Sequence, residues 1–247
     1  MSQYFQEKEA THQSGTNPHI ASKRMLDDQA ASSFMQQVYL TMLIGLGLTG
    51  ISAWYVGTSP ELLGFFYTGI LRWIVMLAPL GLVIYLSARF HKMSFNGAST
   101  AFAIYSVVNG ISLAFIFAIF TTGAIWKVFL ITAGTYGAMA LLGLLTNIDL
   151  SKMGSILYMA LIGLIIASVV NFFMQSEPFD YIISGIGILI FCGLTAYDNQ
   201  KLMRIGTQVD PDSEGAKKLA VMGALTLYLD FINLFLFLLR FFGGGDD

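Results

Sequence analysis

The sequence contains few charged residues. Of its 247 residues, 11% are charged and 55% are hydrophobic, whereas about 25% charged residues are usual in soluble domains. The polar residues concentrate in residues 1–33 and in short breaks between apolar runs of 18 or more residues, which is the pattern of membrane spans. The net charge of −2 favours neither nucleic acids nor acidic substrates as partners. We therefore expect a membrane protein whose main partner is the lipid bilayer.

The sequence also lacks residues that membrane enzymes would need. His12, His19 and His91 all lie in the polar N-terminal segment or in a loop, so a Ser-His protease would have no base within the membrane. No H-E-x-x-H zinc motif is present, and no Gly-rich phosphate loop follows a strand. Lys217 and Lys218 lie only at the mouth of the last apolar run, where a retinal protein would need a lysine inside it. We expect neither catalysis nor a resident cofactor.

Cysteine is almost absent. Cys192 is the single cysteine and lies inside an apolar run, which excludes an intramolecular disulfide and favours a packing role. Residues 1–33 contain no apolar core and no small-residue cleavage site, so they do not resemble a signal peptide. We interpret them as a polar cytoplasmic tail that is mobile before Met25.

Seven apolar runs are long enough to cross a hydrocarbon core as helices. We therefore predict an all-α polytopic bundle of seven transmembrane helices over residues 34–243, separated by breaks that carry turn residues or charge. The second run is the least regular because Arg72 and Pro79 lie inside it. The predicted spans are 34–57, 62–88, 98–121, 125–146, 153–175, 180–203 and 217–242.

The distribution of lysine and arginine predicts an orientation. With a cytoplasmic N-terminus and an outer C-terminus, ten of the 13 basic residues lie inside and three lie towards the outside. The inner ten are Lys8, Lys23, Arg24, Arg89, Lys92, Lys152, Lys201, Arg204, Lys217 and Lys218.

Asp230 lies well inside the last apolar run. An Asp at the centre of a membrane helix costs about 2.5–3.5 kcal/mol on insertion scales. At helical spacing Asp230 shares a face with Thr226 and Asn233, and such a polar stripe faces other helices because its groups need hydrogen-bond partners. Asp230 is either a structural cross-link or a titrating or ion-coordinating group. We favour the second, because intramembrane acids usually serve a function.

Asp198 is the natural partner for Asp230. It follows Thr195 at the cytoplasmic end of the sixth run, and consecutive antiparallel helices can bring the two acids together. Alone, Asp198 could be an ordinary interfacial residue beside Lys201. As a pair, the two carboxylates cannot both ionise cheaply, so they would share a proton and sense pH near neutrality. Their oxygens are also ligands of the kind that Ca²⁺ prefers.

Other polar residues in the spans have less specific interpretations. Arg89, at the cytoplasmic end of the second span, could reach an aspartate or could be a positive-inside anchor. Asn109 and Asn171 are expected to make interhelical hydrogen bonds. Arg72 and Arg240 are expected to extend to headgroups near the outer face.

The loop "DPDSEG", residues 210–215, resembles the opening of a calcium-binding loop. However, position twelve of such a loop would be Val221, where a bidentate Glu belongs, and Pro211 follows the first ligand. We interpret the segment as an acidic linker.

Three motifs resemble those of one family. "LYLDFINLFLFLLRFFG" closely resembles the last-helix signature of the Bax inhibitor-1 family, which includes the transmembrane Bax-inhibitor-motif proteins and their bacterial relatives. "FCGLTAYDNQKL" resembles the sixth-helix motif of the family, and "VVNGISLAFIF" the third-helix motif. The similarity covers residues 34–243.

The resemblance implies a seven-helix bundle whose last helix is enclosed by the other six. It also implies a pH-sensitive Ca²⁺ leak controlled by two aspartates, and the matching positions are Asp198 and Asp230. The arginine that latches this pair in bacterial relatives best matches Arg89. Some relatives also carry an acid midway along helix two, where "VMLAPLGL" has none.

The leading hypothesis is thus a pH-sensitive passive leak for cations, with Ca²⁺ the expected ion, in a bacterial cytoplasmic membrane. Asp198 and Asp230 would share a proton in the closed state, and Arg89 would hold that state through a charge-assisted hydrogen bond. An alternative is an interaction protein that modulates a membrane partner, such as a quality-control protease or a stress or cell-death pathway, through the polar tail. A proton-coupled transporter is a third alternative, but it would need more acid and base relays than the sequence contains.

Overall fold

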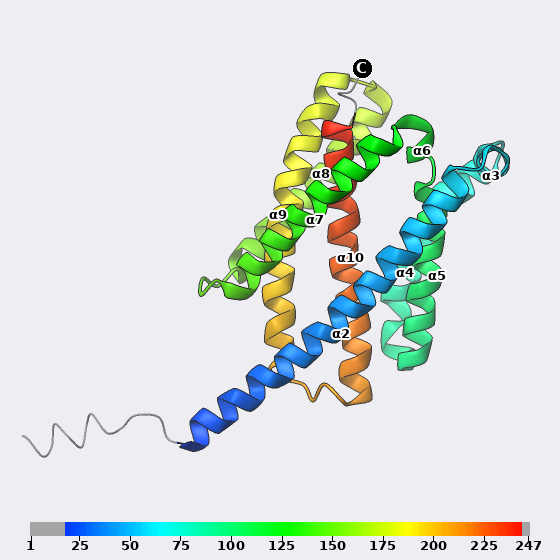
Figure 1. The fold of residues 1–247 in the computed structure, drawn as a ribbon. Coiled ribbons are helices and arrows are strands. Elements are labelled where there is room, and N and C mark those ends of the chain that lie inside the picture. Colours follow the sequence, from blue (N-terminus) through cyan, green and yellow to red (C-terminus); the bar gives the residue numbers. More distant parts are fainter. Residues whose placement is uncertain (1–17, 244–247) are drawn as a thin grey trace, which may run out of the picture.

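The chain folds into helices only. The structure, a computed structural model, describes residues 18–243, and Figure 1 gives the labels used here. The helices are α2 (Pro18–Gly57), α3 (Pro60–Tyr67), α4 (Leu71–Arg89), the 3₁₀ turn η1 (Phe90–Lys92), α5 (Phe95–Leu113), α6 (Ile116–Ile119), α7 (Thr122–Leu145), α8 (Ser151–Met174), α9 (Glu177–Gly206) and α10 (Glu214–Phe242). No strand occurs within residues 18–243, which confirms the predicted fold class.

Seven helical segments are long and apolar enough to cross a membrane, as the sequence predicts, and the protein is a multi-pass integral membrane protein. The first of them begins earlier than expected. Helix α2 begins at Pro18, so residues 18–33, which we interpret from the sequence as part of a polar tail, are helical. Ala31 explains part of this extension, because its side chain is fully buried and its backbone lies against Gly206 of α9. Residues 1–17 of the predicted tail lie outside the described residues.

The second predicted span, 62–88, is wrong in one respect because it is two helices. The short α3 ends at Tyr67, where Thr68 is extended, and α4 begins at Leu71. Gly69 lies between them with φ of +55°, a left-handed conformation that glycine adopts without steric cost. The connection therefore leaves α4 as the membrane-crossing part. Helix α3 lies at the end of the bundle where α10 ends (Figure 1).

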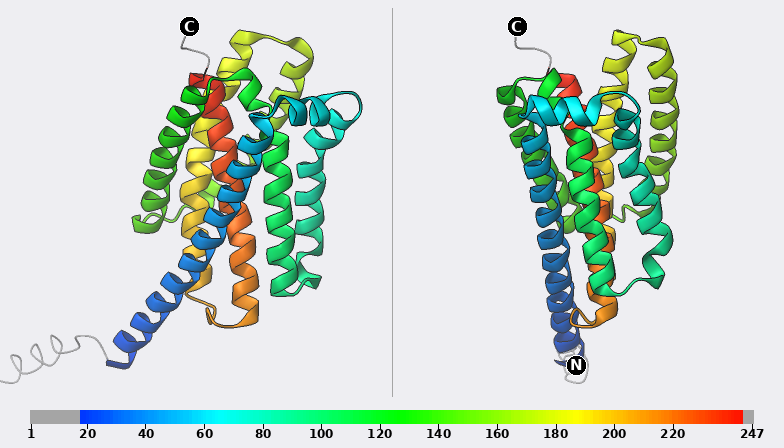
Figure 2. Two further views of the ribbon diagram at one scale, coloured as in Figure 1. Left: turned by 45° about the vertical axis from the view of Figure 1, so that its right-hand side comes forward. Right: turned by 90° about the vertical axis from the view of Figure 1, so that its right-hand side faces the viewer.

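Helix α10 packs against α2, α5, α7 and α9. Of the seven spans it has the largest buried share. Helix α4 packs mainly against α5 and α3, and α8 packs mainly against α9, and both lie on the side of the bundle away from α2 (Figure 2). Four helices thus make the main contacts with α10, whereas the family resemblance implies that six helices enclose it.

Small residues and aromatic rings set the distances between these helices. Gly143 of α7 lies against the backbone of Ala196 in α9, and Gly45 of α2 lies against the ring of Phe102 in α5. Such residues let helices approach closely in a membrane. By contrast, Gly47 and Gly137 have open space beside them, so not every glycine in α2 and α7 serves helix packing.

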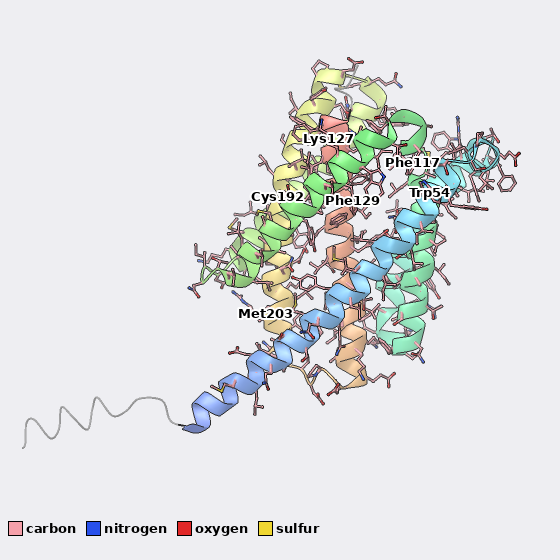
Figure 3. The ribbon with its side chains drawn as sticks, viewed as in Figure 1. Trp54, Phe117, Lys127, Phe129, Cys192 and Met203 are labelled. Atoms are coloured by element: carbon pink, nitrogen blue, oxygen red, sulfur yellow. The ribbon has the colours of Figure 1, made fainter. Side chains whose placement is uncertain are left out.

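An aromatic contact joins α7 to α10. Phe129 of α7 lies towards α10 (Figure 3), where its ring centroid is 5.8 Å from that of Phe231 and 6.4 Å from that of Phe235. A second ring, that of Phe117 in α6, lies against Gly57 at the end of α2. The Phe129 contacts hold α10 against α7, and the Phe117 contact holds α6 against α2.

The opposite half of the bundle is tied by polar contacts from helices to loops. The α9–α10 connection lies at the same end as the start of α2, and α10 ends at the other end (Figure 1). Lys218 donates to the carbonyls of His91 and Met93 over 3.2 Å each. Gln37 donates to the carbonyl of Pro211 over 3.1 Å. This is the end that the charge distribution predicts to be cytoplasmic.

Candidate functional site

Asp198 and Asp230 come together between α9 and α10. The two helices run side by side (Figure 1), and the carboxyl groups lie within hydrogen-bonding reach of each other. Only 2% of Asp198 and 5% of Asp230 is exposed. Since two carboxylates cannot both be ionised cheaply at such a contact, the geometry suits a shared proton.

The two carboxyl groups have unequal surroundings. The hydroxyl of Tyr158, on α8, donates to Asp198, with 3.3 Å to Oδ1 and 3.4 Å to Oδ2. The ammonium group of Lys201, one turn later on α9, also acts on Asp198. Asp230 Oδ2 is buried and has no hydrogen-bond partner among the described residues. Donors and positive charge therefore gather on the Asp198 side of the pair.

Tyrosines from α2 and α7 complete the site. Tyr136 of α7 lies near Asp230, and its hydroxyl donates to Met42 Sδ over 3.6 Å. Tyr39 of α2 donates to Asn199 Oδ1. The amide nitrogen of Asn199 donates to the carbonyl of Thr195 over 2.7 Å, so its side chain is held in one orientation. Tyrosine hydroxyl groups from α2, α7 and α8 thus lie around Asn199 and the two aspartates.

Gln200 and Arg204 of α9 form a polar clamp that begins two residues after Asp198. Gln200 donates to the carbonyl of Ile148 over 2.8 Å and accepts from the amide of Leu150 over 2.9 Å. Arg204 donates to Gln200 Oε1 over 2.9 Å and to Asp149 Oδ1 over 2.8 Å. The clamp fixes the loop between α7 and α8 against α9, and so fixes where α8 begins.

Asp149 is the acidic member of this clamp. Hydrogen bonds from the amide and side chain of Ser151, followed by that from Arg204, lower the pKa of Asp149 from 3.8 to about 2. Its side chain is 65% exposed, so the ion pair is screened by solvent and contributes little to stability. A cavity of about 180 Å³ opens beside the clamp and is lined in part by Lys201 and Tyr197.

Arg89 does not reach the aspartates in this structure. It is exposed at the end of α4, and its guanidinium carbon lies 6.0 Å from the ring centroid of Tyr85. The reason is the packing of α4, which contacts α5 and α3 and not α9 or α10 as its main neighbours. A latch between Arg89 and the pair would require α4 to move.

The residues predicted to support the pair bind elsewhere. The side chains of Thr195, Thr226 and Asn233 each donate to a carbonyl four residues earlier in their own helix. Asn109 donates to the hydroxyl of Tyr228 over 2.7 Å, which is the predicted interhelical hydrogen bond. Asn171 of α8 accepts from the amide of Ser176 and donates to Asp180 of α9 over 3.3 Å, and the second contact is also the predicted interhelical hydrogen bond. Among the described residues, none of the five bonds to Asp198 or Asp230.

Two outer arginines also have partners within the chain. Arg240 lies 3.4 Å from Asp180 in an exposed ion pair, and the guanidinium carbon of Arg72 lies 5.0 Å from the ring centroid of Trp73.

A tightly bound metal ion does not fit the donor set. Within residues 18–243, no group of three or more His, Cys, Asp or Glu side chains could hold a metal, whereas a bound Ca²⁺ takes about six to eight oxygen ligands. In the acidic loop, Asp210 Oδ1 accepts from the amide of Asp212, and Ser213 Oγ caps α10 by accepting from the amide of Ala216. Two aspartates alone suit a passing cation better than a resident one.

Sequence reasoning missed Tyr158, Tyr136, Tyr39 and Asn199. A tyrosine in an apolar helix usually indicates core packing or the membrane interface, so nothing in the pattern distinguished these residues. Asn199 directly follows Asp198, and its position in a span was the one available signal.

The chain matches known proteins along most of its length. The family model described as inhibitor of apoptosis-promoting Bax1 matches residues 31–247. The chain is similar to the inner membrane protein YbhL of Escherichia coli (strain K12), with 46% identity over 213 residues that cover 85% of this chain and 91% of that protein. It is also similar to an uncharacterized protein of Rickettsia prowazekii, with 41% identity over 227 residues that cover 92% and 95% of the two chains.

A third relative is an uncharacterized membrane protein of Streptococcus pyogenes serotype M1, with 37% identity over 165 residues that cover 67% of this chain and 71% of that protein. Because the family model spans most of the chain and these relatives match over most of their length, the protein belongs to the Bax inhibitor-1 family.

Proposed function

We propose that the protein is a pH-sensitive passive leak for cations, with Ca²⁺ as the main ion, and that Asp198 and Asp230 form its proton sensor. The observation that carries the proposal is the contact between two buried carboxyl groups on neighbouring membrane helices. Acids inside membrane spans are costly and most often mark ion pathways or proton relays.

The unmatched oxygen of Asp230 supports a titrating role over a structural one. Asp230 Oδ2 is buried without a hydrogen-bond partner among the described residues. Leaving a buried polar atom unmatched costs about 1–3 kcal/mol, and a carboxyl that served only to cross-link helices would be expected to use both oxygens. Such an atom in a native structure calls for a functional explanation.

In the closed state, the shared proton lets the two carboxyl groups stay in contact. Loss of that proton leaves two negative charges in a region of low dielectric, where their repulsion is strong. The repulsion separates α9 from α10 and loosens the packing around α10. The two carboxylates then present oxygen atoms of the kind that Ca²⁺ prefers to a passing ion.

Arg89 enters this proposal only through a second conformation. Its exposed guanidinium lies over Tyr85, so it would bind the pair only after α4 moved towards α9. Neutralising Arg89 therefore should not alter the contact between Asp198 and Asp230 described here.

The test is Ca²⁺ influx into dye-loaded proteoliposomes of the full-length protein from about pH 6 to about pH 8, the range in which a buried carboxyl pair can titrate. The double variant Asp198→Asn, Asp230→Asn keeps the size of both side chains and removes both protons. Asp212→Asn is the matched control, because Asp212 is exposed in the loop before α10.

We expect flux to rise with pH in the wild type and in Asp212→Asn, and to lose its pH dependence in the double variant. If the wild type gives no flux above empty liposomes at any pH, the leak is refuted, and a role in modulating a membrane partner becomes the better explanation. If the double variant keeps the wild-type pH dependence, the aspartates are not the sensor.

A further inference from the structure

We propose that Tyr158 is a positioning residue that makes the aspartate pair asymmetric. Its hydroxyl holds Asp198 as the carboxylate, so that the shared proton rests on Asp230. This inference deepens the proposed function and rests on it, since it assigns the proton of the same sensor to one of its two members.

The geometry of Tyr158 supports this role. The hydroxyl lies between both oxygens of Asp198, at 3.3 Å and 3.4 Å, and no other described side chain donates a hydrogen bond to Asp198 when Asp230 is left aside. Tyr158 itself is 40% exposed, whereas Asp198 is 2% exposed. A half-buried tyrosine on α8 thus donates to a buried carboxyl group on α9.

The charged and titratable groups that act on the pair favour an ionised Asp198 and a protonated Asp230. Lys201 of α9 and Tyr158 of α8 act on Asp198. Tyr136 of α7 lies near both acids, but its hydroxyl donates to Met42 Sδ and to neither carboxyl group. Hydrogen bonds and positive charge stabilise an ionised carboxyl group, and these are found at Asp198 and not at Asp230.

The surroundings of Asp230 are those of a protonated acid. Oδ2 has no partner among the described residues, which is far less costly for a neutral carboxyl group than for a carboxylate. The remaining hydrogen bond of the pair is then donated by the Asp230 hydroxyl and accepted by Asp198.

The position of Tyr158 depends on a close approach between α8 and α9. Gly154, one turn before Tyr158, lies so near the ring of Tyr197 that an added Cβ would be 2.5 Å from Cε2. The rings of Tyr158 and Tyr197 then meet edge to face, with centroids 6.1 Å apart. Because α8 packs mainly against α9, this approach decides whether the Tyr158 hydroxyl can reach Asp198.

The test follows the infrared C=O band of protonated carboxyl groups during a pH titration of the purified full-length protein. Spectra of the Asp198→Asn, Asp230→Asn double variant are subtracted, so that the remaining band belongs to the pair. Tyr158→Phe keeps the ring and removes only the hydroxyl. It is added separately to Asp230→Asn, where Asp198 titrates alone, and to Asp198→Asn, where Asp230 titrates alone.

With Asp198 alone, we expect Tyr158→Phe to raise the midpoint of the titration by about 0.5–1 pH unit, because the carboxylate loses a hydrogen bond. With Asp230 alone, the midpoint should stay where it is. An unchanged midpoint for Asp198, or equal shifts in both backgrounds, would overturn the proposal, since equal shifts indicate a general change in packing.

A second pair of variants tests the same contact without touching the hydroxyl. Gly154→Ala should displace the ring of Tyr197, against which Tyr158 packs edge to face. It should therefore raise the Asp198 midpoint as Tyr158→Phe does, and combining the two should add little. Gly163→Ala is the matched control on α8, because a Cβ there meets nothing within 4 Å. Equal shifts in the two glycine variants would show that the approach at Gly154 does not matter.

The infrared measurement does not depend on ion flux. If proteoliposomes show no leak but the Asp198 midpoint responds as expected, the proposed function fails and the role of Tyr158 stands. If the leak is present and the Asp198 midpoint does not respond, the proposed function stands and the role of Tyr158 is refuted.

Discussion

The contact between Gly143 and Ala196 gives a direct test of how α7 and α9 pack. An added Cβ at Gly143 would lie 2.8 Å from the carbonyl carbon of Ala196 and 2.9 Å from its Cα. These are backbone atoms, so no rotation of a side chain can relieve the overlap. Gly143→Ala must therefore push α7 away from α9 at Ala196, which lies two residues before Asp198.

The magnitude follows from two opposing effects. Overpacking of this kind costs about 1–3 kcal/mol, and replacing glycine by alanine in a helix gives back at most about 1 kcal/mol. We expect Gly143→Ala to lose about 1–2 kcal/mol. For a chain of this size, that corresponds to a fall in Tm of about 2–8 °C.

Gly137→Ala is the matched control, since Gly137 lies on the same helix with nothing within 4 Å of an added Cβ. Its Tm should stay constant or rise by up to about 4 °C. The assay is thermal unfolding in detergent with a thiol-reactive dye, which reports on the half-buried Cys192, the single cysteine of the chain. If the two variants unfold at the same temperature, the close crossing of α7 and α9 is refuted.

Two further predictions concern other polar contacts. Tyr228→Phe removes a hydroxyl that lies 2.7 Å from the donor nitrogen of Asn109 and 2.6 Å from Thr49 Oγ1. It should cost about 1–3 kcal/mol in the same unfolding assay, because buried Asn109 loses its partner; Tyr55→Phe, at a residue that is 64% exposed, should cost nothing, and equal losses would contradict the reasoning. For Asp149, the carboxyl carbon should titrate by NMR at about pH 2, and at a higher pH in Ser151→Ala, because that variant keeps the amide of Ser151 but loses the hydrogen bond from its hydroxyl. Since this folded-state pKa lies below 3.8, the contribution of Asp149 to stability is present above that value and disappears as pH falls through about 2; a midpoint near 3.8 in the wild type would contradict it.

The sequence was sufficient for the seven spans because the length of an apolar run is set by the membrane thickness. It was not sufficient for their ends. Residues 18–33 are polar, yet Ala31 packs against Gly206 and the helix continues through them. The break before α4 depends on the left-handed conformation of Gly69, which hydropathy does not report.

The aspartate pair could be predicted because an acid in an apolar run is rare and costly. Its neighbours could not. Depth along the membrane suggested Arg89 as a partner, but depth does not determine which helix lies next to which, and α4 packs on α5. Tyr158 was missed for the converse reason: its exposed ring is typical of a lipid-facing residue, and only the tertiary structure brings its hydroxyl to Asp198.

Helix α10 offers an internal comparison for the meaning of Asp230. Two residues earlier, the fully buried Tyr228 shares its hydroxyl with Thr49 of α2 and Asn109 of α5, so every group in that network has a partner. The same bundle therefore can satisfy a buried polar group where it serves only to join helices. Asp230 Oδ2 and Ser184 Oγ of α9 are left without one among the described residues, and of the two only Asp230 can take up and release a proton. Because a structural cross-link would gain by adding that missing bond, whereas a group that must take up and release a proton needs both states within reach, the contrast favours a titrating role for Asp230 over helix cross-linking.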